Sequence, residues 1–260
     1  MRLCIIENGL IPEELQDAFG SYPAMIESWL APALPEADFT YVSAVRGEPL
    51  PEATAFDGYL LTGSRHSCYE HSPWMLHLTA LLRRLRSLRR PVFGICFGHQ
   101  IMADAFDGRT TRAEVGWGVG AQAYRYDAEG LEDAATLVFH QDQVSSLPPQ
   151  ARVAGGSAHC PHGVLEYAFP ARSVQFHPEF SVDYLAALLD RYGNGLLPTD
   201  VTARAWESLR RLSPDNRQIA RWAAAFFREH ARPVCSPFIP SPGTSQRGSV
   251  LRSKTYKHSL

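Results

Sequence analysis

A very sharp turn between an apolar strand and a helix constrains the fold more than any other feature of this sequence. The strand is predicted over residues 91–96 and the helix over residues 98–106. Gly94 and Gly98 flank Cys96 in a Gly-x-Cys-x-Gly pattern. In so tight a turn, a side chain at either flank would collide with neighbouring backbone, so glycine is required there. This order of elements is typical of α/β proteins and exposes the middle residue above the sheet.

The cysteine in this turn is a candidate nucleophile. A helix N-terminus supplies partial positive charge and free N–H groups, and both favour a thiolate. The same pattern also fits a buried structural cysteine in a core strand, because cysteine is often buried. A free cysteine has a pKa of about 8.5, so a nucleophilic Cys96 needs a base from elsewhere in the sequence.

His177 is the histidine best placed to be that base. It lies in Gln175-Phe-His-Pro-Glu179, at the end of a strand predicted over residues 173–176. Open α/β sheets form their sites at such an edge. Pro178 keeps His177 extended, so Glu179 can lie beside the imidazole, orient it and stabilise its protonated form, as in a catalytic triad. Taken alone, His-Pro-Glu also fits a simple turn at a strand end.

Short apolar runs alternate with helical patterns along the rest of the chain. Further strands are predicted over 3–6, 39–45, 59–61, 117–126, 136–139 and 164–168, and further helices over 74–88, 182–192, 200–212 and 216–230. This alternation predicts an α/β fold with a largely parallel central sheet flanked by helices. The stretch 117–176 contains strands without helices, and it predicts antiparallel additions at one edge.

Composition excludes several classes of function. The chain has 260 residues with a formal net charge of -2, which gives no general attraction to nucleic acid or to anionic membranes. No apolar run is long enough to span a membrane or to form a signal peptide. The five cysteines are an odd number and are scattered, which fits a reducing compartment rather than a secreted disulfide scaffold. We therefore expect a cytoplasmic protein without a nucleic-acid or membrane partner.

The C-terminal part differs in composition from the rest. Residues 196–232 contain two helical patterns and are interpreted as a helical extension of the domain formed by residues 1–195. Residues 233–260 contain arginine and lysine but no acidic residue, and they are rich in serine and proline. We expect a disordered basic tail there. It would be either a plain solvated terminus or a segment that binds a partner or lipid.

Two groups of histidines are weighed as metal ligands. His66, His71 and His77 flank Cys68 without the spacing of a recognisable metal site, so loop and helix-surface positions are the better interpretation. The segment 159–162, His-Cys-Pro-His, has no second ligand pair and is predicted as a turn between two strands. We expect no metal ion and no cofactor.

Two motifs together resemble the class I glutamine amidotransferase family: Gly94-Ile-Cys-Phe-Gly-His-Gln100 and Gln175-Phe-His-Pro-Glu179. Two further segments, Tyr59-Leu-Leu-Thr-Gly-Ser64 and His140-Gln-Asp-Gln-Val144, agree in order and spacing with the oxyanion loop and the substrate-side loop of that family. The resemblance covers residues 1–195. It implies the flavodoxin-like fold of the family, a stand-alone member, and a Cys-His-Glu triad.

The resemblance also implies a mechanism. Cys96 would attack the side-chain amide carbonyl of glutamine or of a γ-glutamyl group, His177 would transfer the proton, and Glu179 would hold His177. Water would then release glutamate from the γ-glutamyl thioester. Backbone N–H groups of Gly63 or Ser64, together with that of Phe97, would bind the oxyanion.

The α-amino and α-carboxylate ends of the substrate would be contacted by Gln100, His140 and Asp142. Three functions remain open at this point. The first is a glutaminase-type amidotransferase whose ammonia serves a separate synthetase subunit. The second is a stand-alone γ-glutamyl hydrolase or peptidase, and the third is a non-enzymatic relative that binds a ligand or partner. The intact set of Cys96, His177 and Glu179 argues against the third.

Overall fold

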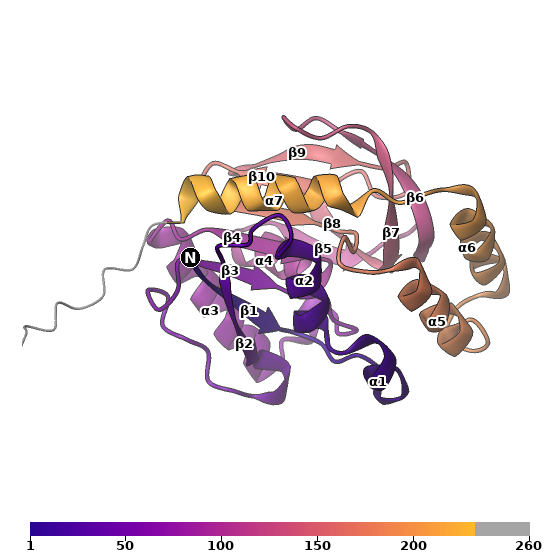
Figure 1. Ribbon diagram of the computed structural model, residues 1–260, viewed down its shortest axis with the longest axis horizontal. Coiled ribbons are helices and arrows are strands. Elements are labelled where there is room, and N and C mark those ends of the chain that lie inside the picture. The colour runs from indigo at the N-terminus through magenta and orange to yellow at the C-terminus, as the bar shows by residue number, and fades with distance from the viewer. Residues whose placement is uncertain (232–260) are drawn as a thin grey trace, which may run out of the picture.

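A mixed sheet of nine strands forms the centre of the molecule, and helices lie against both of its faces (Figure 1). The computed structural model describes residues 1–231. In spatial order the strands are β2 (Asp38–Ser43), β1 (Arg2–Glu7), β3 (Gly58–Leu61), β4 (Val92–Ile95), β11 (Ala171–Val174), β10 (Val164–Tyr167), β9 (Ala151–Gly156), β6 (Gly118–Tyr126) and β7 (Ala134–His140). Two further strands, β5 (Arg109–Arg112) and β8 (Asp142–Ser146), form a separate antiparallel pair.

The described helices cover this sheet and one of its ends. They are α1 (Gln16–Phe19), α2 (Tyr22–Leu30), α3 (Pro73–Ser87), α4 (Phe97–Ala105), α5 (Val182–Tyr192), α6 (Thr199–Arg211) and α7 (Asn216–His230). In Figure 1, α7 runs along one face, whereas α5 and α6 lie at the end formed by β6 and β7. The helices predicted between residues 74 and 106 and from residue 182 onward are therefore present, together with α2.

The sheet changes from parallel to antiparallel pairing at β11. The strands β2, β1, β3, β4 and β11 pair in parallel, whereas β10, β9, β6 and β7 continue the sheet with antiparallel pairs. This confirms the predicted α/β architecture with a largely parallel centre and antiparallel additions at one edge. The turn after β4 carries Cys96, and the segment after β11 carries His177, so the parallel pairing of these two neighbouring strands brings the two motifs to one edge of the sheet.

The core has two layers because successive residues of a strand point to opposite faces of a sheet. Leu3 and Ile5 of β1 pack in the layer that contains α2 and α7. Cys4 and Ile6 of the same strand pack in the layer that contains α3 and α4. All four side chains are fully buried. The parallel strands are apolar on both faces, as expected for strands covered by helices on both sides.

The helix α7 shares the core of the sheet. Ile219, Trp222 and Phe227 pack in the same layer as strands β1, β3 and β4, and the guanidinium of Arg172 on β11 lies 4.4 Å from the ring centroid of Trp222. The helical extension predicted from residue 196 is thus joined to the sheet by a common apolar cluster. The predicted tail, 233–260, lies outside the described residues.

Several elements differ from those expected. The elements α2, β5, β8 and β9 were not predicted from the sequence, and the strand before His177 was predicted to reach residue 176, whereas β11 ends at Val174. The helix α2 begins at a serine cap, since Ser21 accepts a hydrogen bond from the Ala24 N–H at 3.3 Å. Its nine residues are too few for the apolar period to stand out in a sequence pattern.

Candidate active site

Cys96 lies at the sharp turn between β4 and α4. Its φ is 52° and its ψ is −103°, a conformation that residues other than glycine rarely adopt. Such backbone strain costs about 1–3 kcal/mol and persists only where the surrounding structure enforces it. The Cys96 N–H donates to the carbonyl of Val174 at 2.9 Å, which ties the end of β4 to the end of β11. The sulfur therefore stands at the N-terminus of α4, beside the segment that leads to His177.

The two flanking glycines fill positions where no side chain fits. A Cβ atom at position 94 would lie 2.5 Å from the Met102 sulfur and 2.7 Å from the carbonyl carbon of Gly98. A Cβ atom at position 98 would lie 2.6 Å from the Cβ atom of Leu61. The predicted requirement for glycine at both flanks of the turn is confirmed.

His177 and Glu179 form a buried hydrogen-bonded pair. The His177 Nδ1–H donates to Glu179 Oε1 at 2.8 Å, as the sequence predicts. The contact is made across a turn, since the Phe180 N–H donates to the His177 carbonyl at 3.3 Å, rather than along an extended segment. The His177 N–H also donates to the Leu137 carbonyl at 2.8 Å, and this bond fixes the histidine backbone against β7.

The charge state of His177 is set by its neighbours. Burial, the largest single influence, lowers the pKa of His177. The electrostatic interactions with Glu179 and Cys96 and the hydrogen bonds to both residues together outweigh burial and raise the pKa to about 10. The imidazole is therefore protonated at neutral pH. The Phe180 ring stacks on the imidazole with centroids 3.9 Å apart and an interplanar angle of 10°, which places an aromatic face against this cation.

Gly63 touches both the cysteine and the histidine. A Cβ atom at this position would lie 2.8 Å from His177 Cε1 and 3.6 Å from Cys96 Cβ. The loop that contains Gly63 is held by Asn8, whose N–H donates to Thr62 Oγ1 at 2.8 Å and whose Nδ2 donates to the Thr62 carbonyl at 3.0 Å. Asn8 was not identified from the sequence, although a polar residue soon after the apolar strand at residues 3–6 was a usable signal.

The predicted oxyanion donors lie around the cysteine. Ser64 lines the same cavity as Cys96 and His177. Phe97 is the first residue of α4, so its N–H has no acceptor within the helix. The Phe97 side chain is fully buried in the layer of α3 and packs on Trp74 with ring centroids 5.5 Å apart. Only its backbone N–H is therefore available to a substrate.

The predicted substrate-side residues lie on the opposite wall, but their environment differs from a loop. His140 ends β7, Asp142 begins β8, and Gln141 alone connects the two strands. The Gln100 Nε2 donates to the Asp142 carbonyl at 2.9 Å, and the His140 Nδ1–H donates to the same oxygen at 3.2 Å. Placing 140–144 in a loop was wrong, because β8 pairs with the distant β5 rather than following a flexible connection.

His140 is uncharged at neutral pH. Burial lowers the pKa of His140, and the nearby His159 and His177 lower it further, to about 3. Asp142 uses its side chain to accept a hydrogen bond from the Tyr69 hydroxyl at 3.1 Å. This wall of the cavity therefore consists of a neutral imidazole and a hydrogen-bonded carboxylate.

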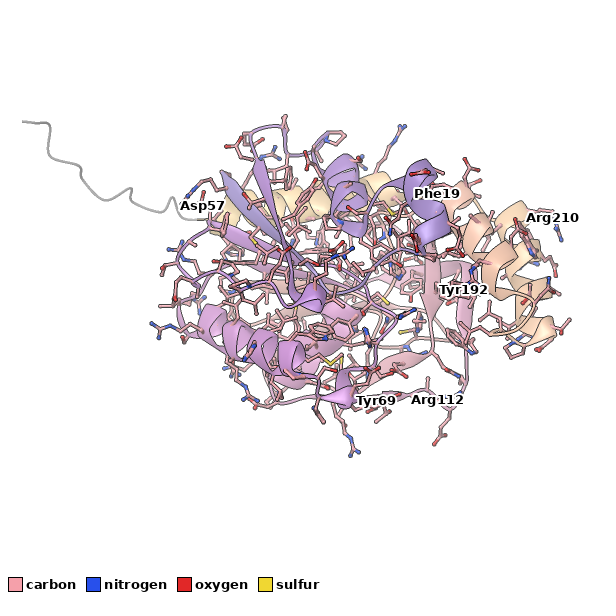
Figure 2. All side chains as sticks on the ribbon, turned by 90° about the horizontal axis from the view of Figure 1, so that it is seen from below. Phe19, Asp57, Tyr69, Arg112, Tyr192 and Arg210 are labelled. Carbon is pink, nitrogen blue, oxygen red and sulfur yellow. The ribbon has the colours of Figure 1, made fainter. Side chains whose placement is uncertain are left out.

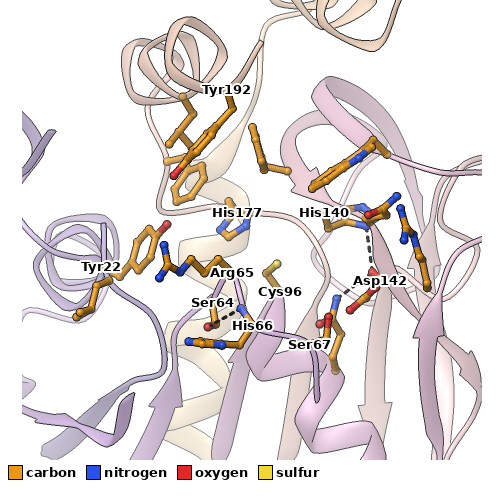
Figure 3. Close-up of a pocket in the computed structure, with 18 of the residues that line it drawn as sticks. Tyr22, Ser64, Arg65, His66, Ser67, Cys96, His140, Asp142, His177 and Tyr192 are labelled. Atoms are coloured by element: carbon orange, nitrogen blue, oxygen red, sulfur yellow. Dashed lines mark hydrogen bonds between the residues drawn. The ribbon is translucent and has the colours of Figure 1, made fainter. Parts of the chain in front are cut away.

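A cavity of about 290 Å³ joins these groups. Figure 3 shows Cys96 between its two walls, with Tyr22 and Arg65 on the side of His177 and with His140 and Asp142 on the other side. Tyr69 and Arg112, which also line the cavity, lie together at one edge of the molecule in Figure 2. Gln100, Ser64, His140 and Asp142 all line this cavity as well.

Several lining residues were not identified from the sequence, among them Tyr22, Arg65 and Phe180. Tyr22 comes from the missed helix α2, and Arg65 directly follows Ser64. Phe180 follows Glu179, and an aromatic residue directly after His-Pro-Glu was a usable signal for it. Trp117 packs on Phe139 with ring centroids 5.9 Å apart and also lines the cavity.

Some of the other histidines and cysteines weighed from the sequence have structural partners or are buried. His66 pairs with Glu70 at 2.8 Å, and Cys160 is buried in the segment between β9 and β10, where a turn was predicted. Within residues 1–231, no group of three or more histidine, cysteine, aspartate or glutamate side chains is arranged to hold a metal ion. In the same part of the chain, no helix has the length and apolar character needed to cross a membrane.

A model of the family described as glutamine amidotransferase class-I matches residues 25–186. The chain belongs to the class I glutamine amidotransferase family. The resemblance inferred from the two motifs is thus confirmed. The matched region contains both motifs, the loop with Gly63, and His140 and Asp142 on the opposite wall of the cavity.

Individual relatives are distant. The chain is 25% identical to gamma-glutamyl peptidase 2 of Arabidopsis thaliana over 174 residues, which cover 63% of this chain and 70% of that protein. It is 32% identical to one subunit of the glutamine-hydrolysing GMP synthase of Methanothrix thermoacetophila over 115 residues, which cover 42% of this chain and 64% of that protein. Both relatives carry the names of enzymes.

The crystal structure of a glutamine amidotransferase from Methylobacillus flagellatus has the same fold. It superposes with a TM-score of 0.68 at 18% sequence identity, covering 96% of this chain and 98% of that one.

Proposed function

We propose that this protein hydrolyses the γ-amide bond of glutamine or of a γ-glutamyl compound through a thioester on Cys96. One observation carries the proposal: the Cys96 thiol, the His177 imidazole and the Glu179 carboxylate meet at one buried point where the sheet changes direction. A thiol, a base and a group that orients the base are the parts that nucleophilic acyl transfer requires.

In the first half of the reaction, the Cys96 sulfur attacks the γ-carbonyl carbon. His177 holds the proton of the thiol, with its Nδ1–H bonded to Glu179, so Nε2 is the atom that carries the proton to the leaving nitrogen. The C–N bond breaks, the amine or ammonia departs with that proton, and a γ-glutamyl thioester remains.

In the second half, water attacks the thioester. His177 removes a proton from the water and returns it to the sulfur as the C–S bond breaks, and glutamate is released. In both halves a tetrahedral oxyanion forms. We assign its donors to the N–H of Phe97 and to the N–H of Gly63 or Ser64, since these backbone groups surround the cysteine. Removal of one such donor typically costs about 3–4 kcal/mol of transition-state stabilisation.

The opposite wall is assigned to the glutamyl half of the substrate. Gln100 and His140 both donate to the Asp142 carbonyl. We assign these two side chains to holding the start of β8 in place beside the substrate. The Asp142 carboxylate lines the cavity, and it is the group of this wall with the charge to attract the α-amino group of the substrate.

Two versions of this function differ in where the nitrogen goes. As a glutaminase-type amidotransferase, the protein would deliver ammonia to a separate synthetase subunit, and the match to part of a GMP synthase supports this version. As a γ-glutamyl peptidase, it would act alone on amine or peptide conjugates, and the longer match to a plant gamma-glutamyl peptidase supports that version. We propose that either reaction takes place in the cytoplasm, since Cys4, Cys68, Cys96 and Cys160 are all unpaired among the described residues.

The test of this function combines hydrolysis with labelling. Purified protein is expected to release glutamate from glutamine or from γ-glutamylglycinamide, and Cys96→Ala is expected to abolish the release while circular dichroism stays unchanged. A glutamine-like diazo-ketone is expected to label Cys96. Burial raises the pKa of Cys4 and of Cys160 to about 12 and that of Cys68 well above its usual value, so these thiols stay protonated and slow to react. An adduct on another cysteine, or full activity of Cys96→Ala, would overturn the proposal.

A further inference from the structure

A second cavity lies next to the one that contains Cys96. Its volume is about 550 Å³, compared with about 290 Å³ at the cysteine. Both cavities are lined by Leu10, Pro12, Arg65, His66 and Tyr192, so they lie side by side, and we call them together the groove. Ammonia, the leaving group from glutamine, is far too small to need this space. The groove therefore fits a substrate whose amine half is larger than ammonia.

Two arginines give this groove a positive character. Arg65 lies at the junction of the two cavities, and Arg46 lines the second one. The acidic residue that lines it is Glu13. Within residues 1–231, neither arginine is within ion-pair distance of a carboxylate.

Two neighbouring carboxylates are engaged by other groups. Glu14 pairs with Arg191. Glu70 accepts a hydrogen bond from the Ser67 N–H at 2.8 Å and pairs with His66. The guanidinium groups of Arg65 and Arg46 are therefore available to an anion from outside the chain.

The chemistry of the site indicates which half of the substrate lies in the groove. His177 must donate a proton to the leaving nitrogen, so the amine half of the substrate lies on the His177 side of Cys96. Figure 3 shows Arg65 and Tyr22 on that side, whereas His140 and Asp142 lie on the other side, which we assign to the glutamyl half. The amine half thus points toward Arg65 and from there into the second cavity.

We propose that the second cavity is a subsite for the amine half of a γ-glutamyl conjugate, and that Arg65 and Arg46 select amine halves that carry a carboxylate. Guanidinium groups bind carboxylates through two parallel charge-assisted hydrogen bonds, which an uncharged amide does not form. The preferred substrates are then γ-glutamyl amino acids and short γ-glutamyl peptides rather than glutamine. This proposal rests on the proposed hydrolysis of γ-amide bonds.

Two substrates that differ in one group test the subsite. γ-Glutamylglycine ends in a carboxylate, and γ-glutamylglycinamide ends in an uncharged amide of the same size. We expect kcat/KM to favour γ-glutamylglycine by about tenfold or more. In Arg65→Gln and Arg46→Gln this preference is expected to fall toward one, and Arg65→Lys is expected to retain part of it. Arg125→Gln is the matched control, since Arg125 is an exposed arginine on β6 that lines neither cavity.

Binding to the Cys96→Ala variant separates this proposal from the proposed function. Titration calorimetry is expected to show tighter binding of γ-glutamylglycine than of γ-glutamylglycinamide, and the added variant Arg65→Gln is expected to remove the difference. Equal kcat/KM and equal affinity for the two compounds would overturn the subsite while hydrolysis stands. Absence of hydrolysis with a carboxylate preference in binding would overturn the proposed function and support the subsite.

Discussion

Two buried histidines face the same cavity from opposite walls and have opposite charge states. His177 and His140 are each 4% exposed, so their burial is equal. Burial lowers the pKa of both imidazoles. For His177, the Glu179 carboxylate and Cys96 reverse this effect and raise the pKa to about 10. For His140, the neighbouring histidines add to the effect of burial, and the pKa is about 3.

The difference shows that the immediate partner, rather than depth, decides the charge of a buried imidazole. The His177 wall presents a cation beside a thiol, which suits proton transfer to a leaving group. The His140 wall presents a neutral ring bonded to a backbone carbonyl, which suits a fixed surface. One cavity therefore combines a reactive wall and a passive wall. The following experiments test how far this contrast holds.

The largest effect is expected from Glu179→Gln, which keeps the shape of the side chain and removes its charge. Without the carboxylate, the pKa of His177 falls, and kcat/KM on γ-glutamylglycine is expected to drop by about 10²–10⁴-fold. A pH–rate profile checks both consequences, since the alkaline limb moves to lower pH. Glu207→Gln, at an exposed ion pair on α6, is the control. Full activity with an unmoved limb would contradict the assigned role of Glu179.

The second effect is on stability. The pKa of His177 is raised on folding from 6.5 to about 10, so its contribution to stability is fully present below about pH 6.5 and is lost as the pH rises through about 10. The loss has a slope of at most about 1.4 kcal/mol per pH unit. Urea unfolding of the wild type and of His177→Gln over this range isolates the contribution. A difference between the two proteins that does not change with pH would refute the raised pKa.

A smaller effect is expected from Phe180→Leu. The stacked ring stabilises the imidazolium by roughly 0.5–1 kcal/mol or more, as cation–π contacts do, whereas leucine retains apolar bulk without a π face. We expect the alkaline limb of the pH–rate profile to move down by about half a pH unit, with a loss of a few-fold in kcat/KM. Phe139→Leu is the control, because Phe139 lines the cavity but packs on Trp117 and Tyr192. Equal shifts in both variants would rule out a specific role for the stacking.

The smallest effect on the pH profile is expected from His140→Gln. Glutamine can still donate to the Asp142 carbonyl and, like the neutral imidazole, carries no charge. The alkaline limb is therefore expected to stay in place, and kcat/KM is expected to change by less than about tenfold. The same pH–rate measurement checks this. A shift of the limb by a full pH unit would mean that the passive wall carries charge after all.

The reactive wall could be predicted from the sequence because its determinants are local. Gly94 and Gly98 are required by a turn of a few residues, and the contact between His177 and Glu179 joins residues two positions apart. The periodic apolar residues of α3 and the apolar run of β4 are likewise visible in short windows of sequence. These features fix the fold class and the position of the cysteine.

The passive wall could not be predicted because its determinants are distant in the chain. Residues 140–144 resemble a polar loop, and they become strand only because β8 pairs with β5. Strand formation depends on such partners more than on intrinsic preference. The second cavity could not be predicted from the sequence for the same reason. Arg46 and Arg65 follow different strands, and they line one cavity only in the folded sheet.

The hydrogen bond from Cys96 to Val174 has a consequence for synthesis of the protein. The cysteine is translated well before β11, and the whole antiparallel half of the sheet lies between them in the chain. Until that half has emerged from the ribosome and docked, the thiol has no imidazole beside it and no strand to fix its turn. The proposed hydrolytic activity therefore requires completion of the sheet, and we expect a nascent chain that lacks β11 to be inactive.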